Sequence, residues 1–244
     1  MADVTLALLR TLANLRQGRI WLYVLTPALF SLLLTIGLAV WGLGALVEQL
    51  LAYPPMTILV GWGLVWLAYT LAYLGGWMAI FAAAYLTASL LAAILILPLL
   101  LKYLAGTEYR DVAAMGADSF TAATLNSIVA AILFILGWLI TLPLWLIPGL
   151  SLILPMLLMA WLNRRTFAYD ALSMHASDDE WRTLRQQHKH SLFMLGLTMA
   201  LLAHIPILGL LVPALAALSF IHFGLEALRR SRDGALVTII GEHL

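Results

Sequence analysis

The sequence contains no cysteine and very little charge. The absence of cysteine excludes disulfides, thiolate metal sites and cysteine nucleophiles. Only 10% of the 244 residues are Asp, Glu, Lys or Arg, whereas soluble domains carry about 25%. The formal net charge of +1 provides no strong electrostatic footprint for nucleic acid, so we expect no nucleic-acid partner.

Apolar residues are present in large excess. They make up 64% of the chain, and the mean hydropathy is +1.00. A soluble protein of this length could not bury so much apolar surface, and the long runs do not alternate as the strands of a membrane barrel do. The composition therefore predicts an all-α, multi-pass integral membrane protein. The sequence shows no catalytic, metal-binding or nucleotide motif, so we expect neither enzyme activity nor a cofactor or metal.

Two apolar stretches share one pattern of proline and glycine. Residues 147–155 read IPGLSLILP, and residues 205–213 read IPILGLLVP. Proline removes a backbone donor and glycine permits unusual dihedral angles, so an apolar helix should break and turn back here. We interpret the two stretches as the tips of re-entrant helical hairpins, which enter the membrane part-way. The tip residues are Pro148, Gly149, Pro155, Pro206, Gly209 and Pro213.

The charge-free runs predict one membrane domain over residues 1–244. Its expected parts are an amphipathic helix (1–19), two long transmembrane helices (20–105), a first hairpin (119–163), a cytoplasmic segment (164–190), a second hairpin (191–225) and a cytoplasmic tail (226–244). The amphipathic helix either lies among the lipid headgroups or packs on the protein. Ser177 and Glu180 form an S-x-x-E capping signal for a short helix over about 178–190.

The uncharged run over residues 49–101 has two interpretations. It is either one long helix or two spans divided at Gly75-Gly76. Glycine pairs in membrane helices more often mark packing positions than loops. We therefore favour one helix of roughly 45 residues, kinked near Gly75 and Pro98.

Limb length and charge placement both favour hairpins that return to their own side. In the second hairpin, the uncharged limb before Pro206 has about 15 residues, and the uncharged limb after Gly209 has about 16. As helices these limbs are roughly 22–24 Å long, which is shorter than a bilayer core of about 30 Å. The outer turn at 48–55 and both hairpin tips contain no Lys or Arg. Two crossings followed by two returning hairpins place all 13 basic residues on one face, which the positive-inside rule makes cytoplasmic along with both termini.

With these features the chain resembles the CysZ family of bacterial inner-membrane sulfate permeases and, more broadly, the etoposide-induced membrane proteins. The resemblance is carried by LRQGRIWLYVLTPAL at 15–29, IPG at 147–149, FAYDALSMH at 167–175 and the second proline pair. It implies two long transmembrane helices and two pairs of half-penetrating helices, assembled into a homo-oligomer of two or more copies. It also implies an inner-membrane protein that admits sulfate to the cytoplasm for cysteine biosynthesis.

A sulfate pathway needs hydrogen-bond donors and positive charge, because a dianion in hydrocarbon is very costly. Arg16 and Arg19, which flank Gly18 just before the first span, are the candidate anion-binding residues together with that glycine. The alternative is that both arginines anchor the chain in lipid headgroups. Secondary pathway candidates are Lys102, Arg164, Arg165 and His204.

Three polar side chains in the apolar runs also have two interpretations. His204 precedes the second tip, where it either gates the pathway or bonds a freed backbone carbonyl. Asn126 and Ser127 either face a pore or make an interhelical hydrogen bond. Function itself remains open between a conduit for sulfate or a related oxyanion and a structural or lipid-interacting protein that deforms the bilayer or scaffolds partners. Membrane lipids are partners under both interpretations.

Overall fold

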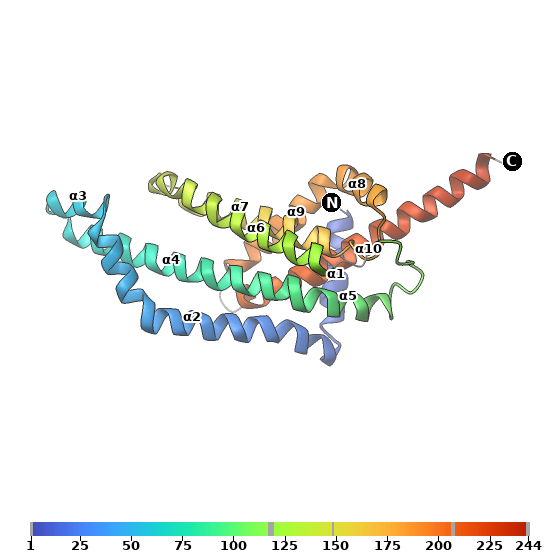
Figure 1. Cartoon of the computed structure of the whole chain (residues 1–244), viewed down its shortest axis with the longest axis horizontal. Coiled ribbons are helices and arrows are strands. Elements are labelled where there is room, and N and C mark those ends of the chain that lie inside the picture. The colour runs from blue at the N-terminus through green and yellow to red at the C-terminus, as the bar shows by residue number, and fades with distance from the viewer. Residues whose placement is uncertain (1, 117–119, 148, 206–207, 243–244) are drawn as a thin grey trace. The chain divides into compact units, whose positions relative to one another are not determined.

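The computed structural model describes residues 2–116, 120–147, 149–205 and 208–242. These residues are helical apart from the connecting turns and loops, as the composition predicts. They form two compact units: Met1–Pro27 with Ser89–Leu244, and Ala28–Ala88. Figure 1 shows the elements in chain order.

The second unit is a pair of antiparallel helix segments. It contains most of α2 (Gly18–Ala52) and α4 (Val65–Leu91), joined by a turn that includes the short α3 (Met56–Gly61). The Ser31 hydroxyl donates a hydrogen bond to the Ala84 carbonyl at 3.4 Å. Gly76 allows α2 to approach closely, because a Cβ there would lie 2.9 Å from Leu43. Gly75-Gly76 is therefore a packing position, as the sequence predicts.

The long run after the outer turn is one continuous helical segment. Val65–Ala105 covers 41 residues, composed of α4, a π turn (η1, Ala92–Ile96) and α5 (Leu97–Ala105). The helix continues through Gly75, and its irregularity lies just before Pro98. A proline has no N–H to donate to the preceding turn, and its ring crowds the carbonyl there. The π turn lies in the turn before this proline, where the Leu97 N–H bonds the Ala92 carbonyl. The run is therefore not divided at Gly75-Gly76, although the long helix begins only at Val65, after the separate α3.

The first unit is built around α10 (Leu208–Glu242). Residues 212–225 of this helix are buried throughout, and α9 (Lys189–Ala203) packs along it. α7 (Leu150–Asp170) packs against α9 and also against α6 (Phe120–Thr141), beside which it lies in Figure 1. Gly196 permits the close approach of α9 to α7, since a Cβ there would lie 2.5 Å from the Ala160 carbonyl oxygen. The two hairpins thus share one apolar core.

Both proline-containing stretches interrupt the helix, but the turns are shorter than predicted. After α6, a 3-10 turn (η2, Leu142–Leu146) ends the first limb, and α7 resumes at Leu150 behind Gly149, whose φ is +87°. In the second hairpin α9 ends at Ala203 and α10 begins at Leu208. Pro155, Gly209 and Pro213 therefore lie in the returning helices, because apolar neighbours continue the helix at the cost of one backbone bond per proline. Pro148 and Pro206 lie outside the described residues.

Four described helices are long and apolar enough to cross a membrane: Gly18–Ala52, Val65–Ala105, Thr121–Trp145 and Leu208–Asp233. The first two are the predicted long spans. The other two belong to the hairpins, and the estimate of about 16 residues for the limb after Gly209 was too short. That limb is longer because α10 stays helical through Glu226 and the arginines beyond it. α9, at 15 residues, stays short of a bilayer core.

Two shorter helices frame the polar end of the first unit. α8 (Asp178–Gln187) begins with the predicted capping box, in which Ser177 and Glu180 each bond the other's backbone N–H. α1 (Ala2–Asn14) packs on α10 with Val4, Ala7, Thr11 and Asn14 buried. Its opposite side exposes Leu9 and Leu12 at 58% and 60%. α1 therefore packs on the protein and still presents an apolar face outward.

Candidate functional site

The predicted anion-binding residues lie together at the corner between α1 and α2. Arg16, Gly18 and Arg19 are all exposed, and no described carboxylate forms an ion pair with either arginine. The Arg19 guanidinium lies over the Tyr103 ring of α5, 5.4 Å from its centroid. Trp21 fixes the corner by donating its indole N–H to the Leu15 carbonyl at 2.8 Å. The corner thus offers two positive charges at a helix N-terminus, where an anion is favoured.

Behind this corner, α1 is joined to α10 by buried polar contacts. The hydroxyls of Thr11 and Ser219 lie 2.9 Å apart. Asn14 places its amide nitrogen 2.8 Å from Nε2 of His222. All four residues are at most 4% exposed. Polar groups buried this deeply must be paired, so these contacts fix the position of α1 along α10.

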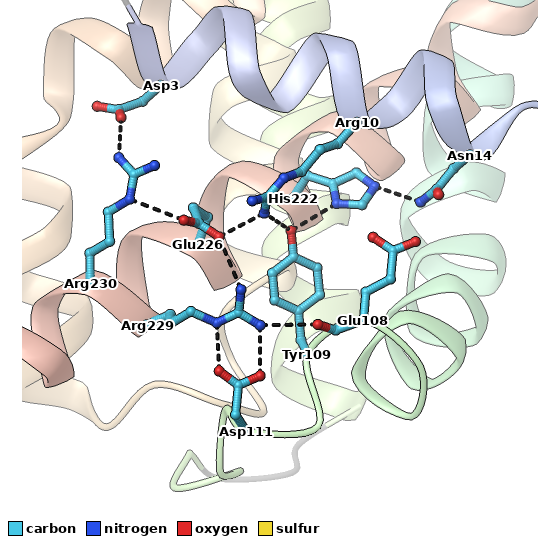
Figure 2. A network of polar contacts seen from close by, with 10 residues as sticks. All are labelled: Asp3, Arg10, Asn14, Glu108, Tyr109, Asp111, His222, Glu226, Arg229 and Arg230. Atoms are coloured by element: carbon cyan, nitrogen blue, oxygen red, sulfur yellow. Dashed lines mark hydrogen bonds and ion pairs between the residues drawn. The ribbon is translucent and has the colours of Figure 1, made fainter.

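His222 also contacts a tyrosine from the loop after α5. Its Nδ1 lies 2.9 Å from the Tyr109 hydroxyl, which accepts a hydrogen bond from Arg10 at 2.8 Å (Figure 2). Burial raises the pKa of the Tyr109 hydroxyl, although the Arg10 hydrogen bond opposes the shift. The tyrosine therefore remains neutral and connects the charged arginine to the imidazole.

Ion pairs extend this network at the polar end of α10. Glu226 accepts hydrogen bonds from Arg10 at 2.6 Å, Arg230 at 3.0 Å and Arg229 at 3.3 Å (Figure 2). Arg229 also makes a bidentate pair with Asp111, with both N···O distances at 2.6 Å. That hydrogen-bonded pair lowers the pKa of the Asp111 carboxyl.

A hydrogen-bond chain links the network to the arginine corner. The Tyr103 hydroxyl donates to Gln17 Oε1 at 2.8 Å, and the Gln17 amide donates to Asn14 Oδ1 at 3.2 Å. Asn14 then reaches His222. Gln17 immediately precedes Gly18, so the backbone of the candidate anion site is anchored to the buried network.

A cleft of about 360 Å³ lies beside the network between α1, α8 and α10. Its charged lining includes Arg10 and Arg230, which are balanced by Glu226 and Asp3. Because the two positive and two negative charges are already paired, this cleft has no excess charge with which to attract an anion. The unpaired arginines at the corner remain the better candidates.

The secondary pathway candidates do not gather at one place. Lys102 is exposed on α5, next to Tyr103. Arg164 and Arg165 are half-buried on α7, and burial together with the charges of Arg185 and Arg165 lowers the pKa of Arg164. His204 caps α9, and its Nδ1 lies 2.7 Å from the Ala200 carbonyl oxygen. This contact agrees with the second interpretation given above, in which His204 bonds a backbone carbonyl freed at the end of the helix.

Asn126 and Ser127 make the predicted interhelical hydrogen bonds. The Ser127 hydroxyl donates to Oδ2 of Asp170 at 2.9 Å, and the Asn126 amide donates to Oδ1 at 3.4 Å and to the Arg165 carbonyl at 3.3 Å. These hydrogen bonds hold the start of α6 against the end of α7. No group of three or more His, Asp or Glu side chains that could hold a metal gathers among the described residues.

A comparison with known protein families shows which family this chain belongs to. The model of the family described as "Sulfate transporter CysZ/Etoposide-induced protein 2.4" matches residues 7–213. The chain belongs to this family. The matched range covers both predicted spans, the first hairpin and the second hairpin up to Pro213. No curated protein and no solved structure matches the chain.

The CysZ/etoposide-induced family match ends before the part of α10 that carries the network. His222, Glu226 and Arg229 were not predicted as functional residues, because a neutral histidine does not interrupt a charge-free run. A signal was nevertheless present in the sequence. Ser219, His222, Glu226 and Arg229 recur at helical spacing on one side of an apolar helix, which marks a polar contact stripe.

Proposed function

We propose that this member of the CysZ/etoposide-induced family is an inner-membrane conduit that admits sulfate to the cytoplasm for cysteine biosynthesis. The family match over residues 7–213 is the observation that carries the proposal. The exposed, unpaired Arg16 and Arg19 around Gly18 support it, since they provide charge and helix-terminal N–H groups in one place. Lys102 is exposed on α5, and its neighbour Tyr103 contacts Arg19 through the ring.

The membrane arrangement proposed here has two crossings and two hairpins. α2 and Val65–Ala105 are the crossings, and α6–α7 and α9–α10 enter from and return to the cytoplasmic side. The four segments that carry the basic residues are residues 10–19, 102–110, 164–189 and 229–232, and they meet in the first unit. Arg10 contacts Tyr109 and Glu226, and Arg232 pairs with Glu180. This meeting supports one face for the basic residues, and the positive-inside rule makes that face cytoplasmic.

The depth of the hairpins differs in this proposal. α9 has only 15 residues, about 22 Å of helix, so the second hairpin enters part-way. Such a tip must have its freed backbone groups satisfied by protein or by water in a cavity. The His204 contact with the Ala200 carbonyl provides one such partner. α6 exposes a broad apolar face, which lipid or a second copy in a homo-oligomer covers.

A structural or lipid-interacting role is the second candidate function. The exposed Leu9 and Leu12 of α1, next to the exposed arginines of the corner, form the kind of surface that lies on anionic headgroups. Reconstitution distinguishes the two. A conduit carries sulfate into liposomes in preference to phosphate and chloride, whereas a lipid-interacting protein carries none and binds anionic vesicles instead.

A further inference from the structure

A buried carboxyl group at the open end of the first hairpin has no part in the proposed anion pathway. Asp170 ends α7 and is 3% exposed. Its two hydrogen-bond donors, the Ser127 hydroxyl and the Asn126 amide, are neutral, and the amide contact is long at 3.4 Å. No ion pair between Asp170 and a described Lys, Arg or His is present. A carboxylate buried in this way is poorly compensated.

A small cavity adjoins this carboxyl group. It measures about 50 Å³ and lies between α6, α7 and the segment formed by η1 and α5. Thr124 and Ser173 contribute hydroxyls to its wall, and the Thr124 Oγ1 is buried without a hydrogen-bond partner. A cavity of this size accommodates a single water molecule. Asp170 therefore lines the same small cavity as an unsatisfied hydroxyl.

We propose that Asp170 is a proton-binding site, in which the neutral carboxyl group donates its hydrogen to the Thr124 hydroxyl through one water in the cavity. Binding one proton from water changes the charge of the side chain from −1 to 0. The neutral form removes the cost of the buried charge and gives the Thr124 oxygen its missing partner. The Ser127 hydroxyl remains bonded in both states, because a carboxyl oxygen accepts from it in either case.

The groups around Asp170 favour this assignment. From η1 and α5 the wall is apolar, with Ala93, Leu97 and Pro98 among its residues. The α6 side chains at the carboxyl or its cavity are Ala123, Thr124, Asn126 and Ser127, and none of them is charged. From α7 itself Arg165 acts on it electrostatically, and α10 packs on α7 through the Phe167–Phe220 ring contact. Burial raises the pKa of Asp170 to about 7, against the hydrogen bonds from Ser127 and Asn126 and the charge of Arg165.

His175 is the nearest titratable group that follows α7 in the chain. It is buried, and burial followed by the charge of Arg232 lowers the pKa of its imidazole. This lowering favours the neutral form of the His175 imidazole. The cavity also meets the π turn of η1, and irregular turns of this kind are frequent at functional sites.

Infrared difference spectroscopy of the purified full-length protein tests the site without any transport. The wild type should show a protonated-carboxyl band that is lost as the pH rises through about 7. Asp170→Asn should remove this band. The control Asp179→Asn should retain it, because the Asp179 side chain is 94% exposed and does not line the cavity. No such band in the wild type, or its persistence in Asp170→Asn, would overturn the proposal.

Two variants that keep the carboxyl group test the cavity. Thr124→Val removes the acceptor of the proton and should shift the titration midpoint down, whereas Ser127→Ala removes a donor to the carboxylate and should shift it up. Each shift should be about tenfold in proton affinity, or one pH unit. Unchanged midpoints in both variants would contradict the proposed partners. Because the band is measured without sulfate, its result does not depend on whether the chain transports sulfate.

Discussion

Arg10 of α1 and Glu226 of α10 form an ion pair of 2.6 Å between residues separated by 216 positions in the chain. The pair is part of the network shown in Figure 2, where Glu226 also forms ion pairs with Arg229 and Arg230. It brings the start of the chain to the polar end of its last helix. In an otherwise apolar protein, such a pairing fixes which ends of the helices of the first unit lie together.

Glu226→Gln should destabilise the first unit. The substitution keeps the shape of the side chain but leaves three arginines without their shared carboxylate. Hydrogen bonds to charged groups contribute about 1.5–3 kcal/mol each, and partial exposure here places the expected loss near the lower end. The unfolding temperature in detergent should fall. The matched control is Asp179→Asn, whose pair with Arg182 is solvent-exposed and should leave it unchanged. Equal unfolding temperatures for both variants would contradict the role given to Glu226.

Gly209→Ala should weaken the second hairpin. A Cβ at this position would lie 2.3 Å from the Ala203 carbonyl oxygen, so the turn between α9 and α10 would have to shift. Overpacking of this kind costs about 1–3 kcal/mol. Gly42→Ala is the control, since nothing lies within 4 Å of a Cβ there and alanine favours the helix. The unfolding temperature should be lower than that of the wild type for Gly209→Ala and higher for Gly42→Ala.

Stability should depend on pH through Asp170. The pKa of this group is raised from 3.8 to about 7 by burial, so the folded state binds its proton more tightly than the unfolded state. The contribution to stability is then greatest below the unfolded pKa and declines as the pH rises to about 7, with a slope of at most about 1.4 kcal/mol per pH unit. Unfolding temperatures across this window should decline in the wild type. Asp170→Asn should flatten the dependence, and an equal slope in both would refute the assignment.

The proposed membrane arrangement can be mapped with single cysteines, because the chain has none of its own. A cysteine at Thr57, in the turn between the two long spans, should react with an impermeant maleimide from outside the cell. Cysteines at Thr107 and Ser231 should react only after the membrane is opened. Leu144, near the first tip, distinguishes a hairpin that spans from one that enters part-way. Labelling of Thr107 from outside would contradict the two-crossing arrangement.

Local features of the fold could be predicted from the sequence, whereas long-range pairing could not. The capping box at Ser177, the packing role of Gly76 and the hydrogen-bonding role of Ser127 each depend on neighbours within a few turns or on general properties of apolar helices. The Arg10–Glu226 pair depends on tertiary contact between distant segments, which a single sequence does not reveal. For the same reason the role of Asp170 could not be predicted, because its surroundings are formed where α5, α6 and α7 meet.

In the proposed conduit, the anion site depends on charge at the corner between α1 and α2. Replacing Arg16 and Arg19 together by alanine should reduce sulfate flux at least tenfold, roughly the effect of losing one charge-assisted hydrogen bond. Arg182→Ala, which removes an exposed arginine on α8, should leave flux unchanged. Because Arg19 also lies over the Tyr103 ring, Arg19→Lys tests charge with altered geometry and should retain part of the flux.

The central claim is that the chain conducts sulfate, and flux into liposomes tests it most directly. Purified wild-type protein is reconstituted, and uptake of labelled sulfate is measured beside phosphate, chloride and protein-free vesicles. We predict uptake of sulfate above the empty vesicles and above the two control anions. Sulfate uptake no faster than in protein-free vesicles, with the protein folded and inserted, would contradict the account.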